Sequence, residues 1–180
     1  EIRDVTLKQG RSGAMVLVSV AHDYFTDGNT PQISEIQNIV YRDRPGPALD
    51  SALGPQVETQ NPQKSCATDA QVTLTPDPVL LFRYSALTFN AHRIHYDLEY
   101  ARNAENYPDL VVHGPLQATL LLNLVANQTG RTPARFSYRG VAPLFCGQPV
   151  GLHLEAAQND GTVWLRDNAG QTTMKANYQI

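Results

Sequence analysis

The sequence predicts an α+β domain in which an antiparallel sheet wraps around one central helix. A segment from Pro115 to about Gln128 has the length of a helix and is apolar on nearly all sides, so it needs cover all round. Three strand-like segments without a preceding helix open the chain, which indicates an incomplete N-terminal copy of the same unit. Four strand-like segments separated by turns follow the central helix, at 135–141, 150–156, 162–167 and 172–179.

The N-terminal segments span 2–7, 14–22 and 33–41. The middle one is rich in β-branched residues, which is typical of a mostly buried strand, and turn-forming residues separate the three. We expect them to pair as an antiparallel meander. Glu1 is not a methionine and the first segment follows it directly, so we expect a processed or truncated product.

Prolines recur between 44 and 78 among Gly, Ser, Asn and Gln, and no periodic apolar face is present there. This stretch is predicted to be an extended linker whose simplest role is connection. It would join a partial N-terminal domain, 1–43, to a complete domain, 79–180.

The complete domain opens with an apolar and aromatic segment, 79–87, around Arg83. Residues 94–102 are predicted to form a short helix, with Ile94, Leu98 and Ala101 on one face. The central helix then starts with proline at the first helical position, where proline is well tolerated, and ends at Gly130.

The composition describes a soluble globular protein, with 42% hydrophobic and 17% charged residues. A net charge of −3 provides no broad cationic surface, so no nucleic-acid partner is expected. The longest apolar run, 116–126, is shorter than the roughly 20 residues that span a bilayer, so no membrane partner is expected. No leader sequence is recognisable, and Cys66 and Cys146 lack a paired spacing, which predicts a cytoplasmic protein with reduced thiols.

The densest polar cluster is the stretch 88–97, which contains Asn90 and His95. Asn90 can cap the turn that follows it, and His95 begins the predicted short helix, so both side chains are expected at one helix mouth. There an amide could orient a water molecule while a neutral imidazole removes its proton. A surface helix start with ordinary polar residues explains the same spacing, and the residues alone leave both interpretations open.

His113-Gly114-Pro115 stands at the start of the central helix. Unpaired N–H groups and the positive end of the helix dipole suit a polarised carbonyl oxygen, and Gly114 lets a ligand approach the backbone closely. A turn that merely starts the helix is the alternative.

A metal site made from His92, His95 and His113 is not expected, because no cysteine pair or His-Glu-x-x-His pattern accompanies them. The sequence also has no Gly-x-Ser-x-Gly elbow and no glycine-rich phosphate loop. Three arginines are spaced so that they could line a strand edge and meet phosphates, or form a solvated strand face: Arg131, Arg135 and Arg139.

Two stretches resemble the MaoC-like dehydratases, FRYSALTFNAHRIHY at 82–96 and YPDLVVHGPL at 107–116. The likeness is to the branch that contains mesaconyl-C4-CoA (3-methylfumaryl-CoA) hydratase and the mitochondrial type 2 hydroxyacyl-thioester dehydratase. Residues 10–13 and 34–45 also resemble the N-terminal half of that hydratase, so the resemblance covers nearly the whole chain.

The resemblance implies a double hot-dog fold, each copy a sheet wrapped around a helix, with the C-terminal copy complete and catalytic. It implies a lyase that reversibly adds water to a trans-2-enoyl-CoA thioester and gives a 3-hydroxyacyl-CoA. His95 matches the family's histidine and would be the general base in hydration, Asn90 would hold the water, and the Gly114 N–H would hold the thioester oxygen. No cofactor beyond the coenzyme A thioester substrate is implied, and because hot-dog domains usually pair, a homo-oligomer is expected.

A branched C4–C5 dicarboxylic acyl group is one candidate substrate. Arg83 or Arg93 could meet its second carboxylate, although a structural ion pair is the alternative for either. Tyr96 and His113, which lie within these two motifs, complete the set of candidate substrate-binding residues.

The chain departs from the family pattern in two ways. Asn90 stands where the wider family has an aspartate, and because an amide cannot act as a base, the acid–base work would fall to His95. A full-length hydratase of this branch also has a helix before Glu1, without which the face with Val16, Val18 and Val20 would be exposed. A non-catalytic acyl-thioester-binding or assembly subunit is therefore the rival function, and a hot-dog thioesterase is a third, disfavoured by the lack of a carboxylate at Asn90.

Overall fold

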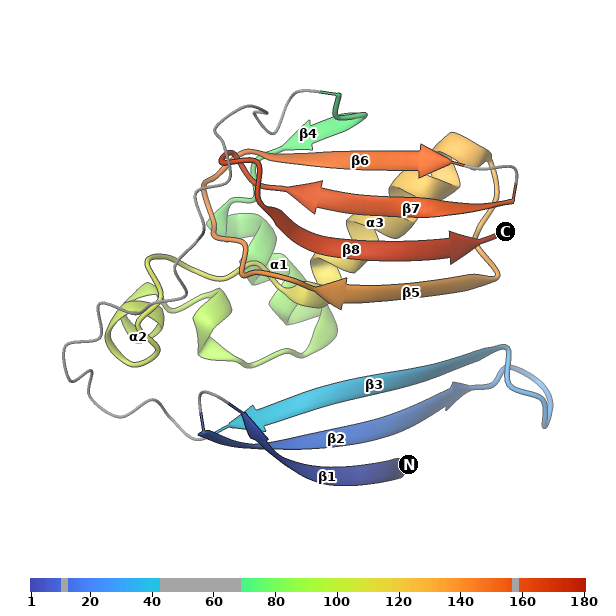
Figure 1. Ribbon diagram of the computed structural model, residues 1–180, viewed down its shortest axis with the longest axis horizontal. Coiled ribbons are helices and arrows are strands. Elements are labelled where there is room, and N and C mark those ends of the chain that lie inside the picture. Colours follow the sequence, from blue (N-terminus) through green and yellow to red (C-terminus); the bar gives the residue numbers. More distant parts are fainter. Residues whose placement is uncertain (11–12, 43–68, 157–158) are drawn as a thin grey trace. The chain divides into compact units, whose positions relative to one another are not determined.

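The computed structural model describes residues 1–10, 13–42, 69–156 and 159–180. By its internal contacts the chain divides into two compact units, Glu1–Val57 and Glu58–Ile180. Each unit has its own antiparallel sheet (Figure 1).

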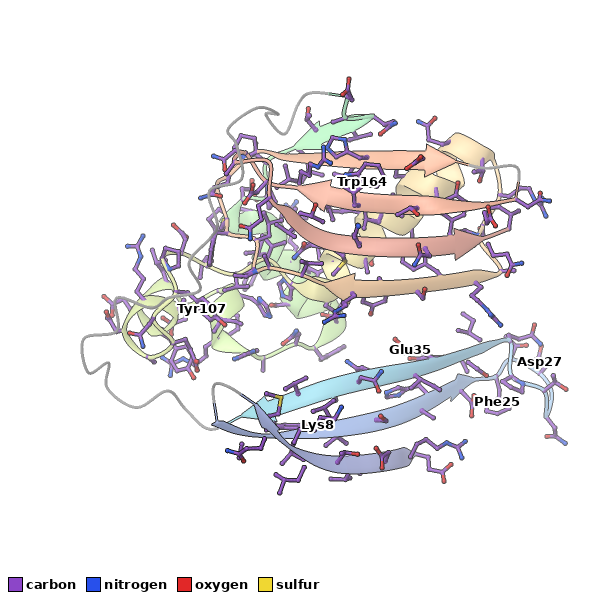
Figure 2. The ribbon with its side chains drawn as sticks, in the orientation of Figure 1. Lys8, Phe25, Asp27, Glu35, Tyr107 and Trp164 are labelled. Carbon is purple, nitrogen blue, oxygen red and sulfur yellow. The ribbon has the colours of Figure 1, made fainter. Side chains whose placement is uncertain are left out.

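The first unit is a meander of β1 (Ile2–Gly10), β2 (Gly13–Tyr24) and β3 (Ile33–Arg42), in that order. The three predicted strands are confirmed, and each is longer than the hydrophobic pattern alone indicated. Side chains stand on both faces of the sheet (Figure 2).

One face of this sheet carries a cluster of apolar side chains. Because side chains alternate across a strand, the paired residues of the three strands share a face. Leu7, on this face, is 72% exposed, whereas Val16 and Val18 are partly buried. We call this surface the valine face; in the recorded register it comprises Val5, Leu7, Val16, Val18, Ile39 and Tyr41.

The second unit is a five-stranded antiparallel sheet with the order β4-β6-β7-β8-β5. Its core has α3 (Gly114–Thr129) lying along the inner face of the sheet (Figure 1). On β8 the residues alternate, with Met174, Ala176 and Tyr178 buried toward the core. The strands are β4 (Val72–Leu74), β5 (Arg135–Gly140), β6 (Val150–Ala156), β7 (Asp160–Arg166) and β8 (Thr172–Gln179).

The central helix confirms its prediction to within one residue at each end. Gly130 ends it in the left-handed conformation, with φ of 69°, which favours glycine. Its one fully inward polar side chain is Gln117, which donates to the Val112 carbonyl and accepts a hydrogen bond of 3.0 Å from the Thr173 hydroxyl. A sheet wrapped around a buried helix is the hot-dog fold.

The region before the central helix differs from the prediction in two places. The expected linker, 44–78, contains the strand β4 near its end, and residues 43–68 lie outside the described part of the chain. The segment 79–87 is the helix α1 (Pro78–Thr88), for which Asp77 is the N-cap and Pro78 the first residue. Aspartate followed by proline is a helix-start signal that periodicity alone does not reveal.

The single helix predicted over 94–102 is wrong. The structure has a 3₁₀ turn, η1 (Arg93–His95), followed by the separate helix α2 (Leu98–Asn103). Asp97 divides them because its side chain caps α2 by accepting the Tyr100 N–H at 3.0 Å. His95 therefore ends a 3₁₀ turn and does not begin an α-helix.

Cys146 is a buried free thiol that donates a hydrogen bond to the Pro76 carbonyl, and Cys66 lies outside the described residues. Burial raises the pKa of the Cys146 thiol. Among the helices that the structure describes, none is long and apolar enough to cross a membrane.

Candidate active site

Val111 and Val112 organise the candidate site through their backbone. The N–H of Val111 donates to the carbonyl of Ile94 at 2.9 Å, and the N–H of Val112 donates to the carbonyl of Leu144 at 2.8 Å. The turn that carries His95 and the segment around Leu144 are thereby tied to the short extended segment that leads into α3.

His95 is 7% exposed, and its Nδ1 lies 2.7 Å from the carbonyl oxygen of Val111. Because a carbonyl oxygen only accepts, Nδ1 carries the proton, and in the neutral ring the lone pair is on Nε2. Burial is the main cause that lowers the pKa of His95, and the nearby His92 lowers it further. At neutral pH, His95 is therefore an uncharged imidazole with Nε2 available to take a proton.

His113 is the N-cap residue of α3, and its ring stacks on that of His95, with 3.6 Å between centroids and 18° between planes. Its Nε2 lies 2.8 Å from the Ser85 hydroxyl oxygen, and Tyr84 packs edge-on against it at 4.9 Å. Burial lowers the pKa of His113 to about 4. The side chain is 0% exposed, which favours a supporting position over the substrate contact expected from the sequence.

Asn90 lies just beyond the end of α1, where Phe89 adopts the left-handed conformation with φ of 53°. Its side-chain oxygen accepts the His92 N–H at 3.0 Å, so it closes a tight turn, whereas η1 itself has no side-chain cap. Among the described residues no partner engages the amide nitrogen, which leaves two N–H donors for a water oxygen.

Gly114 is the first residue of α3, where backbone N–H groups have no partner within the helix. A Cβ built on Gly114 would meet only Met174 Cε, at 3.9 Å, which is ordinary contact. Internal packing therefore does not require glycine here. Close approach of a ligand to the backbone remains a physical reason for it.

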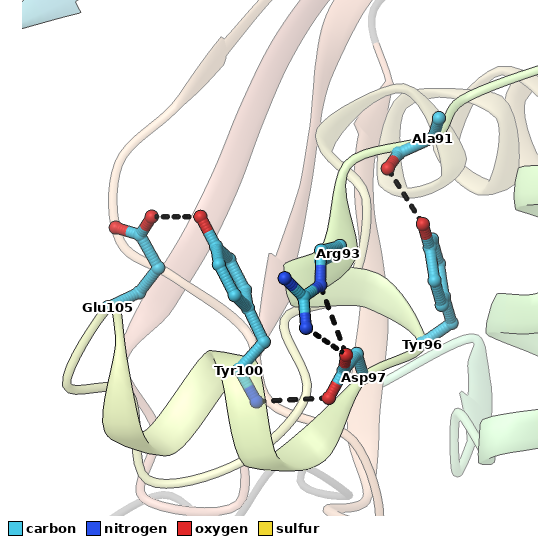
Figure 3. A network of polar contacts seen from close by, with 6 residues as sticks. All are labelled: Ala91, Arg93, Tyr96, Asp97, Tyr100 and Glu105. Carbon is cyan, nitrogen blue, oxygen red and sulfur yellow. Dashed lines mark hydrogen bonds and ion pairs between the residues drawn. The ribbon is translucent and has the colours of Figure 1, made fainter.

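Arg93 and its neighbours form a polar network on the next turn (Figure 3). Both Nε and Nη2 of Arg93 donate to Asp97, at 3.1 and 2.7 Å, and the guanidinium lies 4.2 Å from the centroid of the Tyr100 ring. The Tyr100 N–H and then Arg93 hold the pKa of Asp97 below its usual value. This geometry favours the structural ion pair for Arg93.

A pocket of about 320 Å³ adjoins Asn90. Tyr96 lines it, and its hydroxyl donates to the Ala91 carbonyl at 2.8 Å (Figure 3). Arg83 is exposed on α1 and is not among the lining residues. The wall carries no charged side chain; it consists of Phe82, Ser85, Ala86, Phe89, Asn90, Ala91 and Tyr96.

Ser85 is the residue that sequence reasoning missed. It is buried on α1 and reaches His113 across 28 positions of the chain. The sequence indicates Ser85 only indirectly. Asp77-Pro78 is a helix-start pattern, and a helix that begins there places Ser85 two turns along it, shortly before Asn90.

The remaining candidates lie elsewhere in the second unit. Arg135 and Arg139 are exposed on β5, which is an edge strand, and Arg131 precedes that strand. This placement fits the alternative prediction of a solvated strand face. In the part of the chain that the structure describes, no group of three His, Cys, Asp or Glu residues is placed to hold a metal ion.

Two characterised proteins are similar in sequence. Mesaconyl-C(4)-CoA hydratase of Chloroflexus aurantiacus is 44% identical over 173 residues, which cover 91% of this chain and 59% of that protein. The mitochondrial hydroxyacyl-thioester dehydratase type 2 of Schizosaccharomyces pombe is 42% identical over 94 residues, or 51% of this chain and 30% of that protein. The chain thus spans less than two thirds of the length of either relative.

Solved structures agree with this chain in fold. HtdX from Mycobacterium tuberculosis superposes with a TM-score of 0.73 at 21% identity, over 99% of this chain and 67% of that one. The R-hydratase PhaJ1 from Pseudomonas aeruginosa superposes with a TM-score of 0.52 at 18% identity, over 60% of this chain and 75% of that one. The profile of hydroxyacyl-thioester dehydratase type 2 matches residues 1–146. The chain belongs to the hydroxyacyl-thioester dehydratase type 2 family.

Proposed function

We propose that the protein is a hydro-lyase that reversibly hydrates a trans-2-enoyl-CoA thioester to a 3-hydroxyacyl-CoA. The observation that carries the proposal is the hydrogen bond from His95 Nδ1 to the Val111 carbonyl. It leaves the Nε2 lone pair free in a ring that stacks on the residue capping α3. Base and helix terminus, the two parts that the addition of water requires, are thereby held together.

In the proposed reaction the water oxygen bonds to C3 of the enoyl group, and His95 Nε2 takes one water proton. The N–H groups of the Asn90 amide would donate to the water oxygen and hold it for attack. Negative charge moves to the thioester oxygen, where the Gly114 N–H would stabilise the enolate. The protonated His95 then gives its proton to C2, so one water has been added and the base is regenerated. Every step uses protein groups and water, and no cofactor is proposed.

The acyl group is argued from the pocket beside Asn90. Its wall has no charged side chain, and Arg93 is engaged by Asp97, which favours an alkyl-substituted enoyl group. The name of the Chloroflexus relative points instead to a dicarboxylic acyl group, for which exposed Arg83 is the remaining candidate partner. Comparing kcat/KM for crotonyl-CoA and mesaconyl-C4-CoA decides between them.

The test is loss of the enoyl-thioester absorbance on incubation with wild type and His95→Ala. Removing a general base typically costs about 10²–10⁴-fold in rate, so we expect a loss of that size with folding intact. His92→Ala is the matched control, because His92 is an exposed histidine whose ring lies edge-on 5.6 Å from His95, and its loss should be far smaller. Equal activity of wild type and His95→Ala would refute the assignment.

The same assay separates the rival functions. Release of free thiol without a hydroxyacyl product would indicate a thioesterase, and binding of the thioester without turnover would indicate an acyl-binding subunit. The homo-oligomer and the cytoplasmic location belong to the proposal as well, to be measured by light scattering and by cell fractionation.

A further inference from the structure

His113 is a buried titratable group for which the proposed reaction has no use. Its side chain is fully buried, and of its two ring nitrogens only Nε2 has a partner, the Ser85 hydroxyl at 2.8 Å. Among the described residues, Nδ1 has none. An unpartnered buried nitrogen is costly, so a reason for keeping a histidine here, where an apolar residue would pack without that cost, has to be found.

The tautomer follows from the partners. A buried N–H without an acceptor is rarer in proteins than a buried acceptor without a donor. The favoured tautomer therefore has its proton on Nε2, donated to the Ser85 oxygen, and a bare lone pair on Nδ1. In this state the ring of His113 is uncharged, and its orientation is fixed by one hydrogen bond from α1.

The second observation is the parallel stack on His95, with 3.6 Å between centroids. Val111 holds the edge of the His95 ring through Nδ1, and His113 lies against its face. A positive charge on His113 at this distance would strongly oppose the protonation of His95. For His95 to act as a base, its neighbour has to stay neutral.

The groups that face the two rings are few. His92 is edge-on to His95, and Tyr84 is edge-on to His113. Among the described residues no carboxylate contributes to the pKa of either histidine. Neutrality of His113 therefore comes from burial and not from a compensating charge.

We propose that His113 and Ser85 are positioning residues for His95: the Ser85 hydroxyl fixes the His113 ring, and that ring is the flat neutral surface that holds the imidazole of His95. The kinetic part of this inference rests on the proposed function. The structural part, the state of the His95 ring, can be measured without turnover.

The experiment compares two double variants that both remove the Ser85–His113 hydrogen bond. Ser85→Ala/His113→Phe keeps a flat ring against His95, whereas Ser85→Ala/His113→Leu keeps an apolar side chain without a flat face. Each is measured by the NMR pH titration of the His95 ring and by the pH dependence of kcat and KM for crotonyl-CoA hydration. Single Ser85→Ala is made as well, because it disturbs the core least.

We expect the Phe pair to retain at least about tenfold more kcat than the Leu pair, with KM changed less than kcat. The His95 titration should stay low in the Phe pair and move toward 6.5 in the Leu pair, and single Ser85→Ala should shift it in the same direction. Identical His95 titrations and rates for the two double variants would overturn the proposal. If the Leu pair does not fold, a Ser85→Ala variant that titrates and reacts like wild type would overturn it. If wild type hydrates no enoyl thioester, the proposed function fails, and the titrations still decide whether His113 positions His95.

Discussion

At His95 one hydrogen bond decides which ring nitrogen can act. The sequence predicted this residue and Asn90 together at the mouth of one helix, whereas in the structure Asn90 closes the turn before η1 and His95 is the last residue of η1. The sequence could not predict the tautomer, because the deciding acceptor is the carbonyl of Val111, sixteen positions away. The sequence did predict that the Asn90 oxygen accepts a backbone N–H; in the structure the donor is His92, which leaves the amide nitrogen for the role of water donor.

At Gly114 the structure allows a substitution that separates folding from ligand approach. In Gly114→Ala the new methyl has room, since its only neighbour is Met174 Cε at 3.9 Å, so the unfolding midpoint should change little. A methyl where the thioester approaches the backbone should displace it and lower kcat/KM by on the order of 10²-fold. Urea unfolding and the hydration assay measure the two effects, and an unchanged kcat/KM would argue against an oxyanion site at this N–H.

The helices and strands with a strong periodic spacing of apolar residues were predictable from the sequence. Those whose ends are determined by N-cap side chains were not. The central helix and the later strands follow from apolar spacing that the packed core preserves. α1 was missed because its start is signalled by Asp77-Pro78, and the 94–102 helix failed because Asp97 caps a new helix in its middle. Side-chain hydrogen bonds to the backbone act at single residues and leave no period to detect.

The cap of α1 gives a prediction at this scale. The Asp77 side chain accepts the Leu80 N–H at 2.7 Å. Asp77→Ala should lower the free energy of unfolding by about 1 kcal/mol, and Asp77→Ser, another good N-cap residue, should restore most of it. Urea denaturation of the three proteins measures this. Equal losses for alanine and serine would show that the cap hydrogen bond is not the source of the stability.

For the whole molecule, the stacked histidines link stability to pH. The pKa of His113 is about 4 in the folded state, below its usual value of 6.5, and that of His95 is lowered too. Between about pH 4 and pH 6.5 the unfolded chain binds more protons than the folded chain does. The free energy of unfolding therefore has its full value above about pH 6.5 and decreases as the pH falls toward about 4. We expect a loss on the order of 2 kcal/mol, measured by urea unfolding across this range. A smaller loss is expected for Ser85→Ala/His113→Phe, and an identical one would exclude His113 as its source.

The valine face gives a second prediction for the whole molecule. An exposed apolar surface of this kind promotes association, and Leu7 is its most exposed member. Leu7→Lys should lower the weight-average mass measured by light scattering at high protein concentration. Lys8→Glu is the matched control, since Lys8 is on the same strand and the opposite face (Figure 2). If both variants associate as wild type does, the valine face is not where copies of the chain meet.

The alternating burial of β8, described above for Met174, Ala176 and Tyr178, also bears on how such a chain diverges. A wrapping strand has to keep apolar side chains at every second position, and many different residues satisfy that demand. The turns around Asn90, His95 and His113 depend on the identity of individual atoms, so they tolerate far less drift. The family match, residues 1–146, includes all of these turns. As related chains diverge, the strands of this wrap can therefore lose detectable sequence similarity while keeping their shape. The turns are the part in which similarity is expected to persist.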